Sequence, residues 1–426
     1  LGKPLIHYSL KVAQQVTRTK PVIVIGHEAD AVRQIVGDTA RFVVQEPQLG
    51  TGHAVQQAES LLRGDADNIL VITADMPLLS PDTLRDLIRA QENVDPTLTP
   101  LTLLTVMAED PRGFGRVVRE EDGSVSAIVE EAQASPEQLA IRELNASVYC
   151  FNAAWLWNAL KRIPLSPKGE YYLTDLAGIA TASGLTAQAL VVEQADELIG
   201  INNRVHLAEA EAALRRKINY QWMLNGVTMI DPDTTYIEPD VEIGPDTVIW
   251  PNTCLQGQSR IGEGCILGPN TILKDTQVGD RSRILASVSE KAIIEDDVEV
   301  GPFARLRRGA HLAQGVHMGN FGEIKNSYLG PGTKMGHFSY VGDATISNDV
   351  NIGAGTITCN YDGYKKHPTE IGAGAFIGSD TMLVAPVKLG AGARTGAGAV
   401  VTKDVPDNTL AVGVPARAIR KLEQSD

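Results

Sequence analysis

The chain has 426 residues, which is enough for two domains that each bury a hydrophobic core. Its formal net charge of −14 argues against nucleic acid or an anionic membrane as the main partner, although a few local cations can still line a pocket for a phosphorylated substrate. No apolar run approaches the roughly 20 residues of a membrane span, and the four cysteines lack CxxC pairing, so we expect a cytoplasmic protein with reduced thiols.

The first half alternates short β runs with helical stretches. It opens on a helical segment, LGKPLIHYSL, which is unusual because a helix at the edge of a parallel sheet normally follows a strand. The predicted strands are PVIVIGHE, RFVVQEP, NILVITADMPLL, TLLTVMAED and LNASVYCFN. Their alternation with helices predicts a Rossmann-like α/β domain over residues 1–204, with a parallel sheet flanked by helices. GRVVREEDGSVSAIVEE predicts a hairpin that turns at Asp122-Gly123.

The second half has a different pattern. A charged helical segment, NRVHLAEAEAALRRKINYQWMLNG, predicts a helical linker over residues 205–225. Beyond it, an aliphatic residue followed by glycine recurs at multiples of six residues, which predicts a parallel β-helix over residues 226–426 with three short strands per coil. Small residues permit its tight corners. We expect CNYDGYKKHPTE, residues 359–370, to leave the prism as a loop.

Several residues suit nucleotide chemistry in the first half. Gly50, Thr51 and Gly52 lie between a strand end and a helix start, where free backbone amides suit a base, a ribose or a phosphate. An ordinary strand-to-helix loop would have the same pattern. Asp75 ends a buried strand, and Ser80 and the proline after it already start the next helix, so a hard-metal ligand is favoured over a helix cap.

The β-helix half carries polar residues that the repeat does not need. They are Arg307, Lys325, His337, Tyr340 and Asn351. Two cations and an imidazole on one groove would bind an anion and accept a proton. A solvated surface histidine is the alternative interpretation for the imidazole.

In their order along the chain, these motifs resemble one family. QLGTGHA, the strand-end Asp75, GFGRVV, IVEE, KGEYYLTD and GINNRVHL occur as in the bifunctional N-acetylglucosamine-1-phosphate uridyltransferase / glucosamine-1-phosphate acetyltransferases. The resemblance covers essentially the whole chain. It implies a left-handed β-helix that transfers acetyl from acetyl-CoA to glucosamine-1-phosphate. It also implies a preceding domain that transfers uridyl from UTP to the acetylated sugar phosphate and releases pyrophosphate. The product, UDP-N-acetylglucosamine, serves cell-wall synthesis, and the enzyme is expected to be a homotrimer.

The resemblance also implies site residues for uridyl transfer. Uracil would be held by Gln45, Gly50 and Thr51, and the acetylated sugar by Gly115, Glu130 and Asn145. Asp75 and Asn202 would bind Mg²⁺, with Thr73 and Ala74 beside them.

For acetyl transfer, the resemblance makes His337 the general base. Arg307 and Lys325 would clamp the phosphate, and Tyr340 and Asn351 would hold the sugar. Asn360 would stabilise the thioester oxyanion. The expected acetyl-CoA contacts are Ala354, Asn360, Tyr361, Ser379 and Ala397.

Two departures from the family pattern stand out. The family opens with a strand and a glycine-rich AAGxGTRM…PK loop, and Leu1-Gly2-Lys3-Pro4 matches only the segment directly after that loop. We therefore expect a chain that begins at Leu1 to be impaired in uridyl transfer and to retain acetyl transfer. Val414 stands near a family arginine, and Arg417 or Arg420 is the candidate to contact a CoA phosphate instead.

Two alternatives stay open. A zinc β-helix enzyme of the γ-carbonic-anhydrase kind would need converging histidines, and His311, His317 and His337 are available, but without an H-x4-H pair. In the other alternative, the nucleotidyltransferase-like half is regulatory and the protein is an acetyltransferase only.

Overall fold

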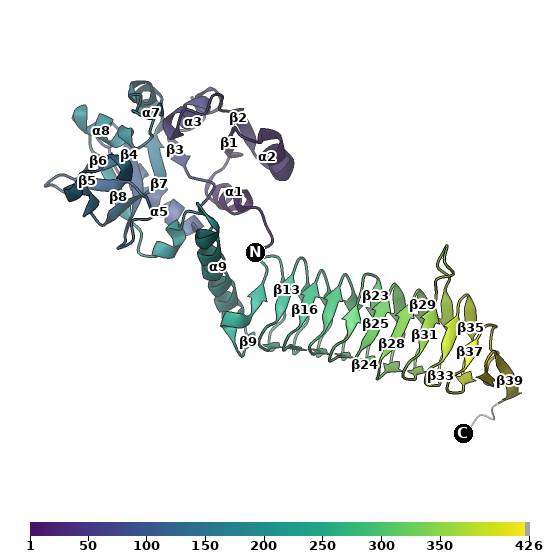
Figure 1. Cartoon of the computed structure of the whole chain (residues 1–426). Helices are drawn as coiled ribbons and strands as arrows, with labels where there is room; N and C mark the ends of the chain where they lie inside the picture. Colours follow the sequence, from purple (N-terminus) through teal and green to yellow (C-terminus); the bar gives the residue numbers. More distant parts are fainter. Residues whose placement is uncertain (422–426) are drawn as a thin grey trace. The chain divides into compact units, whose positions relative to one another are not determined.

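The computed structural model describes residues 1–421 (Figure 1). The chain forms two compact units, one of residues 3–213 and one of residue 214 onward together with residues 1–2. Helix α9 (Arg204–Leu224) confirms the helix expected between the two halves and contributes residues to both units. Within residues 1–421, no helix is long and apolar enough to cross a membrane.

The first unit contains a mixed six-stranded sheet in the order β3-β7-β4-β8-β6-β5. Its strands are β3 (Asn68–Val71), β4 (Leu101–Met107), β5 (Arg116–Arg119), β6 (Val125–Val129), β7 (Glu143–Asn152) and β8 (Ala187–Val191). The expectation of a parallel sheet is confirmed for β4 and β8 but is wrong for β7, which runs antiparallel to both β3 and β4. Burial alone determined the apolar pattern of β7, and that pattern carries no information on strand direction. A separate parallel pair consists of β1 (Val22–Ile25) and β2 (Arg41–Val44).

Helices cover both faces of the six-stranded sheet. Successive residues of β4 point to opposite faces, so Leu103 packs in one hydrophobic cluster and Leu104 in the other. The helices of this unit are α1 (Leu5–Val16), α2 (Ala29–Val36), α3 (Thr51–Gln57), α4 (Glu59–Leu62), α5 (Pro81–Glu92), α6 (Pro136–Leu139), α7 (Ala153–Ala159) and α8 (Asp175–Ala182). Helix α2 does not cover this sheet, because its Val32 and Val36 pack in a separate cluster with Ile23 of β1 and Phe42 of β2. Helix α5 starts as predicted, with Ser80 accepting a hydrogen bond from the Thr83 amide (3.1 Å) and proline at its first position.

The β5–β6 hairpin confirms the predicted turn at Asp122-Gly123. The two strands are antiparallel, and Gly123 takes a φ of +86°, where glycine is favoured. Asp122 Oδ1 accepts a hydrogen bond from the Ser124 amide (2.9 Å), which closes the turn.

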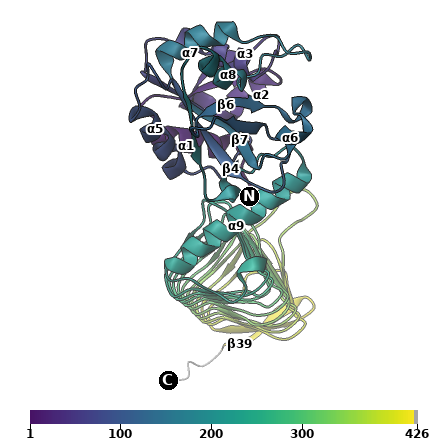
Figure 2. The same ribbon diagram turned by 90° about the vertical axis from the view of Figure 1, so that its left-hand side faces the viewer.

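The second unit is a parallel β-helix, as predicted. Figure 2 views it along its axis, where the coils superimpose as a three-sided prism. Face 1 comprises β10 (Tyr236–Ile237), β13 (Cys254–Gln256), β16 (Ile272–Lys274), β19 (Val288–Glu290), β22 (Arg305–Leu306), β25 (Gly322–Lys325), β28 (Ser339–Gly342), β31 (Ile357–Cys359), β34 (Met382–Val384) and β37 (Val400–Val401). Face 2 comprises β11 (Glu242–Ile243), β14 (Arg260–Ile261), β17 (Gln277–Val278), β20 (Ile293–Ile294), β23 (Ala310–Leu312), β26 (Ser327–Leu329), β29 (Ala344–Ile346), β32 (Thr369–Ile371) and β35 (Val387–Leu389). Face 3 comprises β9 (Thr228–Met229), β12 (Val248–Ile249), β15 (Ile266–Leu267), β18 (Arg283–Ile284), β21 (Glu299–Val300), β24 (His317–Met318), β27 (Lys334–Met335), β30 (Asn351–Ile352), β33 (Phe376–Ile377), β36 (Arg394–Thr395), β38 (Thr409–Gly413) and β39 (Ala416–Lys421).

Coil length varies along the prism. Tyr236 pairs with Cys254, a step of 18 residues, whereas Ile272 pairs with Val288, a step of 16. The step from Ile357 to Met382 is 25 residues, because residues 360–368 leave the coil between β31 and β32. The predicted loop is thus confirmed, within the wider range of residues 359–370.

Glycines let the coils stack closely. A Cβ atom on Gly372 would lie 2.5 Å from the backbone nitrogen of Ala391 in the next coil, closer than real Cβ contacts allow. This glycine does not have a positive φ, so the constraint is the approach of two backbones and not a special conformation. Aliphatic side chains such as Leu255 and Leu273 fill the interior and are fully buried.

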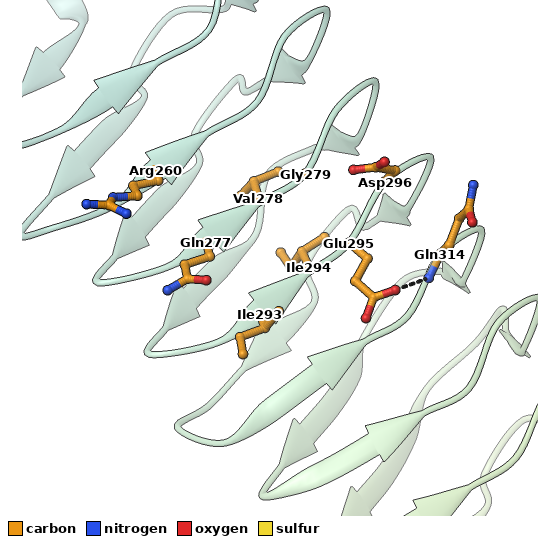
Figure 3. Close-up of a pocket in the computed structure, with 9 residues that line it drawn as sticks. All are labelled: Arg260, Gln277, Val278, Gly279, Ile293, Ile294, Glu295, Asp296 and Gln314. Carbon is orange, nitrogen blue, oxygen red and sulfur yellow. Dashed lines mark hydrogen bonds between the residues drawn. The ribbon is translucent and has the colours of Figure 1, made fainter.

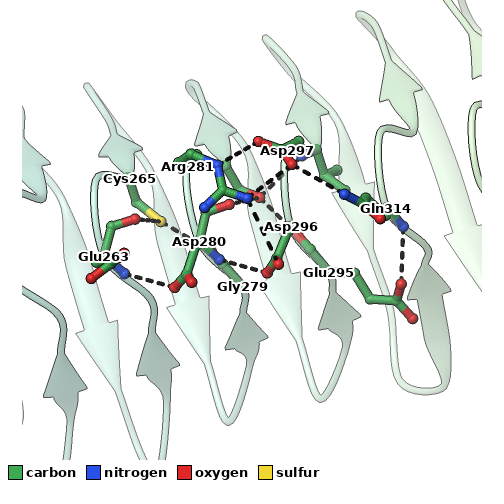
Figure 4. Close-up of polar contacts among 11 residues, drawn as sticks. Glu263, Cys265, Gly279, Asp280, Arg281, Glu295, Asp296, Asp297 and Gln314 are labelled. Atoms are coloured by element: carbon green, nitrogen blue, oxygen red, sulfur yellow. Dashed lines mark hydrogen bonds and ion pairs between the residues drawn. The ribbon is translucent and has the colours of Figure 1, made fainter.

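Carboxylates hold successive corners together between faces 2 and 3 (Figure 4). Asp280 accepts from the Glu263 amide (3.0 Å), and Asp296 accepts from the Asp280 amide (2.8 Å). Arg281 binds Asp297 through two hydrogen bonds of 2.8 and 3.0 Å. These acidic residues satisfy backbone donors that the corners leave free, which gives them a structural role.

The part of α9 in the second unit closes the first coil. Ile218 and Trp222 pack against the interior of the prism. Asn219 is buried and donates to the carbonyls of Pro232 (2.8 Å) and Thr235 (3.0 Å). The helix thereby covers apolar groups and backbone oxygens that have no preceding coil.

Candidate functional site

A cluster of cations lies on face 1 of the β-helix. The Arg307 amide donates to the Ile324 carbonyl (2.9 Å), which places Arg307 one coil from Lys325. Lys366, from the 360–368 loop, lowers the pKa of Lys325, first by hydrogen bonding to it and then through its charge. Arg307 donates to Glu323 (2.8 Å), but neither lysine forms an ion pair with a carboxylate in the described part of the chain.

Tyr340 and Asn360 meet beside this cluster, above Gly342. A Cβ atom on Gly342 would collide with the Tyr340 hydroxyl and would lie 2.7 Å from Asn360 Nδ2, so the glycine makes room for both. Gly342 is in register with Lys325. Asp343 accepts from Asn360 Nδ2 (2.6 Å) and thereby orients that carboxamide.

The structure therefore brings together four residues that the sequence nominated, Arg307, Lys325, Tyr340 and Asn360. It adds Lys366 and Asp343, which sequence reasoning missed. The signal for Lys366 was its place in an insertion that breaks the repeat, since loops on a rigid scaffold carry function.

His337 lies at the corner between faces 3 and 1, in the turn that joins β27 to β28, and is exposed. Ala354, Ser379 and Ala397 follow it at the same corner in later coils. The Asp380 amide donates to the Ala354 carbonyl (2.6 Å) and the Gly398 amide to the Ser379 carbonyl (2.8 Å). These backbone hydrogen bonds connect successive coils at this corner, and the side chains there are small; we call this row of residues the corner ladder.

The remaining nominated residues are more scattered. Asn351 lies on face 3 in register with Lys334. Tyr361 is 61% exposed in the loop, and its hydroxyl donates to the Gly363 carbonyl (2.6 Å). Among residues 1–421, no hydrogen bond or ion pair joins His337 to the cation cluster. His337 precedes strand β28 at one edge of face 1, and the cation cluster lies at the other edge of that face.

A zinc site of converging histidines does not fit this geometry. His311 lies on face 2 and contacts Glu295 (2.7 Å), whereas His317 lies on face 3 and contacts Glu299 (3.0 Å). The described residues contain no group of three His, Cys, Asp or Glu side chains that is able to hold a metal ion.

Face 2 carries a shallow depression of about 410 Å³ (Figure 3). Its polar lining includes Arg260, Gln277 and Glu295, and Ile293 contributes an exposed apolar side chain. None of the residues nominated from the sequence lies in it. This depression is separate from the candidate acetyl-transfer residues on face 1.

In the first unit, two distant segments form one surface. The Gly52 amide donates to the Tyr171 carbonyl (2.8 Å), and the Tyr171 amide donates to the Leu49 carbonyl (2.8 Å). The Leu173 amide donates to Thr51 Oγ1 (3.0 Å). Gly50 has a φ of +93°, and a Cβ atom there would lie 2.7 Å from the Tyr171 oxygen. QLGTGHA is therefore held tightly against KGEYYLTD.

The nominated sugar-binding residues form a second group in this unit. The Asn145 amide donates to the Gly115 carbonyl (2.9 Å), and Asn145 Nδ2 donates to the Tyr149 hydroxyl (2.8 Å). Glu130 accepts from Thr174 Oγ1 (2.8 Å). Burial raises the pKa of Tyr149, and the charge of Glu130 raises it further. Glu130 is therefore close enough to act on the tyrosine that binds Asn145. Tyr149 and Thr174 were not predicted from the sequence.

Asp75 was expected to end a strand, but β3 ends at Val71 and Asp75 lies in the turn four residues later, where its backbone contacts Ile201, the residue before Asn202. The Ile201 amide donates to the Asp75 carbonyl (3.1 Å), and a Cβ atom on Gly200 would lie 3.7 Å from Asp75 Oδ2. Ser9 donates to the Ala74 carbonyl (3.2 Å). Asp75 Oδ1 and Thr73 Oγ1 are buried without a hydrogen-bond partner. Orphaned buried oxygens fit a hard cation such as Mg²⁺.

Comparison with known proteins identifies similarity to both halves. Residues 1–103 match the model of a MobA-like NTP transferase domain, and residues 240–275 and 368–403 match the bacterial transferase hexapeptide, six repeats. The chain is 47% identical over 412 residues to the bifunctional protein GlmU of Heliobacterium modesticaldum, covering 96% of this chain and 89% of that protein. GlmU of Trichlorobacter lovleyi is 46% identical over 415 residues, and the match covers 96% of this chain and 90% of that protein. GlmU of Exiguobacterium sibiricum is 44% identical over 412 residues, and the match covers 96% of this chain and 91% of that protein.

Proposed function

The chain belongs to the family of the bifunctional protein GlmU, and from that premise we propose which of its residues carry each of the two reactions. The protein is a transferase with glucosamine-1-phosphate acetyltransferase and N-acetylglucosamine-1-phosphate uridyltransferase activities. The β-helix carries out acetyl transfer from acetyl-CoA, and the α/β unit carries out uridyl transfer from UTP. A regulatory role for the α/β unit is the weaker candidate, because that unit retains two buried oxygens suited to a metal.

The main support for the acetyl-transfer site is the pair of amines of Lys325 and Lys366, neither of which forms an ion pair with a carboxylate within residues 1–421. Lys325 and Lys366 lie side by side and repel each other, which is unfavourable until an anion binds between them. The phosphate of glucosamine-1-phosphate supplies that anion, and Arg307 adds a third cation. Tyr340 and Asn351 hold the sugar.

His337 acts on the amine of the same substrate. The neutral amine nitrogen attacks the thioester carbonyl of acetyl-CoA, and a C–N bond forms. His337 takes the proton that the nitrogen loses, the C–S bond breaks, and the CoA thiolate leaves and is protonated. Asn360 donates to the oxyanion of the intermediate, with its carboxamide held by Asp343. The corner ladder of Ala354, Ser379 and Ala397, with Tyr361 in the nearby loop, binds the pantetheine arm.

Steady-state kinetics on charge-neutral variants tests this assignment. Lys325→Met and Lys366→Met should each raise KM for glucosamine-1-phosphate at least roughly tenfold, with little change in KM for acetyl-CoA. Lys388→Met is the matched control, because Lys388 is already paired with Glu370 (3.1 Å) on face 2. If KM for acetyl-CoA rises instead, the cations belong to the CoA site and the assignment is wrong.

The uridyltransferase site is proposed around Asp75. Asp75 and Asn202 would hold Mg²⁺, with Thr73 and Ala74 lining the site, and the ion would supply positive charge that offsets the charge of the phosphates. Gln45, Gly50 and Thr51 hold the uracil. The acetylated sugar is bound by Gly115, Glu130 and Asn145, supported by Tyr149 and Thr174.

Metal binding tests this half without relying on turnover. Asp75→Asn should abolish Mn²⁺ binding measured by electron paramagnetic resonance, whereas Asp82→Asn, on the exposed side of α5, should leave it unchanged. Equal Mn²⁺ binding by both variants would refute the metal assignment.

We also propose that the protein is a cytoplasmic homotrimer. Phe303, Phe321 and Phe338 are 61%, 60% and 55% exposed at one corner of three successive coils, and the first two rings stack with centroids 5.4 Å apart. An exposed aromatic column on a rigid prism favours association between copies. A cytoplasmic location fits enzymes that use acetyl-CoA and UTP.

A further inference from the structure

We propose that His53 is a positioning residue that orients the Gln45 carboxamide and thereby makes the nucleotide site select uracil over cytosine. The inference rests on the proposed uridyltransferase function of the α/β unit. Gln45 follows β2 and His53 lies in the first turn of α3. The two side chains meet because the loop between them reverses at Gly50, whose φ is +93°.

The contacts determine which way the carboxamide faces. The Gly50 carbonyl can only accept, so the Gln45 atom 2.9 Å from it is Nε2. The same Nε2 lies 3.2 Å from His53 Nδ1. A carboxamide nitrogen has two hydrogens, and these two contacts use both. His53 Nδ1 is therefore an acceptor, and the proton of the neutral ring is on Nε2. The Gln57 atom 2.9 Å from His53 Nε2 is also an amide nitrogen, so this tautomer requires the Gln57 carboxamide to turn over and accept through Oε1. That turn gives up only the long contact of Gln57 Nε2 with the His53 carbonyl (3.3 Å).

This orientation leaves Gln45 Oε1 as the atom available to a ligand. In the described part of the chain, no group donates to Oε1, and the atom is not among the buried polar atoms that lack a partner. A free carbonyl oxygen accepts from the N3–H of uracil. Cytosine has a lone pair at N3 and would face the same oxygen with repulsion.

His53 matters because one contact alone holds the carboxamide weakly. The Gly50 carbonyl already accepts from the Ala54 amide (3.1 Å), so it is shared between two donors. A reversed carboxamide would set its oxygen against two acceptors when His53 is present, but against only one when His53 is absent. The reversed form offers N–H to the base and would accept cytosine.

The test is the binding preference of the full chain for UTP over CTP, measured by calorimetry with Mg²⁺ present. His53→Phe keeps a ring near Tyr171, whose centroid is 6.4 Å away, but it lacks the acceptor. It should lower the ratio of the two association constants about tenfold, the value of one hydrogen bond in a site that rejects a mismatched partner. His53→Asn places an amide oxygen near the position of Nδ1 and should restore the ratio to within about threefold of wild type. His53→Ala is a second variant without the acceptor, in case the larger ring disturbs folding, and Tm reports that.

The outcomes separate this inference from the function on which it rests. If the wild-type chain binds UTP and CTP equally, or binds neither, the uridine site itself is refuted. If wild type prefers UTP and both His53→Phe and His53→Ala keep that preference, only the role of His53 is refuted. Loss of the preference in His53→Asn as well would mean that packing, and not the acceptor, orients Gln45.

Discussion

At the scale of single residues, Lys325 shows how a neighbour changes the chemistry of a side chain. Lys366 lowers the pKa of Lys325 by hydrogen bonding and by repulsion, Arg307 lowers it further, and Asp343 opposes the change. A lowered pKa means that the amine is charged below that pKa and loses its charge as the pH rises through it, earlier than an ordinary lysine does. Binding of the phosphate is therefore expected to weaken at a lower pH than it would with an ordinary lysine.

Replacing the neighbour should move that alkaline limb. In Lys366→Met, Lys325 loses its main source of repulsion, so the pH at which 1/KM for glucosamine-1-phosphate falls should rise. At neutral pH the same variant should bind the substrate more weakly, because one cation is gone. The pH profile of KM checks both effects. An alkaline limb unchanged from wild type would show that Lys325 is not the titrating group.

His337 is expected to be the general base of acetyl transfer. His337→Ala should lower kcat by roughly 10²–10⁴-fold, the usual loss on removal of a general base, and should leave uridine-nucleotide binding unchanged. His317→Ala is the control, because His317 is also on the β-helix surface but is paired with Glu299 on face 3. Near-normal acetylation by His337→Ala would disprove the assignment.

At the scale of elements, the loop at Gly50 depends on a close approach to KGEYYLTD. Gly50→Ala adds a Cβ atom 2.7 Å from the Tyr171 oxygen in a residue with φ of +93°, so it combines a steric clash with backbone strain. Gly64→Ala is matched in conformation, with φ of +86°, but its Cβ atom would meet open space. Gly64→Ala should cost about 1 kcal/mol of unfolding free energy and Gly50→Ala several times more. Denaturant titration checks this, and equal losses would show that the two segments can separate at little cost.

The stacking of coils makes a similar prediction for the β-helix. Gly372→Ala places a Cβ atom 2.5 Å from the backbone of the next coil and should lower Tm by several degrees. Gly336→Ala meets nothing within 4 Å and should change Tm little. Thermal unfolding followed by circular dichroism distinguishes the two. A tolerated Gly372→Ala would mean that the coils can move apart without breaking the hydrogen-bonded ladder.

At the scale of the complete chain, each unit has its own core. The hydrophobic cluster inside the β-helix contains no residue before Ile218, and the clusters around the six-stranded sheet contain none after Leu198. Stacked coils contact only their neighbours, so the β-helix is stabilised locally along its length.

A fragment that starts at residue 203 and keeps all of α9 should therefore fold, sediment as a trimer and acetylate glucosamine-1-phosphate at a rate close to that of the full chain. Analytical ultracentrifugation and the acetyltransfer assay check the two claims separately. A folded, active monomer would refute the trimer, and an unfolded fragment would show that the β-helix needs the first unit.

Features that repeat, or that depend on neighbours along the chain, could be predicted from the sequence. The spacing of Ile-Gly and Val-Gly pairs predicted the β-helix, because each glycine permits the next coil to approach. The cap at Ser80 and the turn at Asp122-Gly123 were equally readable, since their hydrogen bonds span only two or three residues.

Features that depend on residues far apart in the chain required the tertiary structure. The apolar run of β7 predicted a buried strand but not its antiparallel direction. Lys366 lies 41 positions after Lys325, and only the looped-out segment brings their amines together. Gln45 was nominated from its motif, but the orientation of its carboxamide is set by its contacts with Gly50 and His53. Local sequence patterns indicate which residues are buried and what conformation the backbone takes. The electrostatic surroundings of a side chain and the direction of its hydrogen bonds depend on which residues the fold brings together.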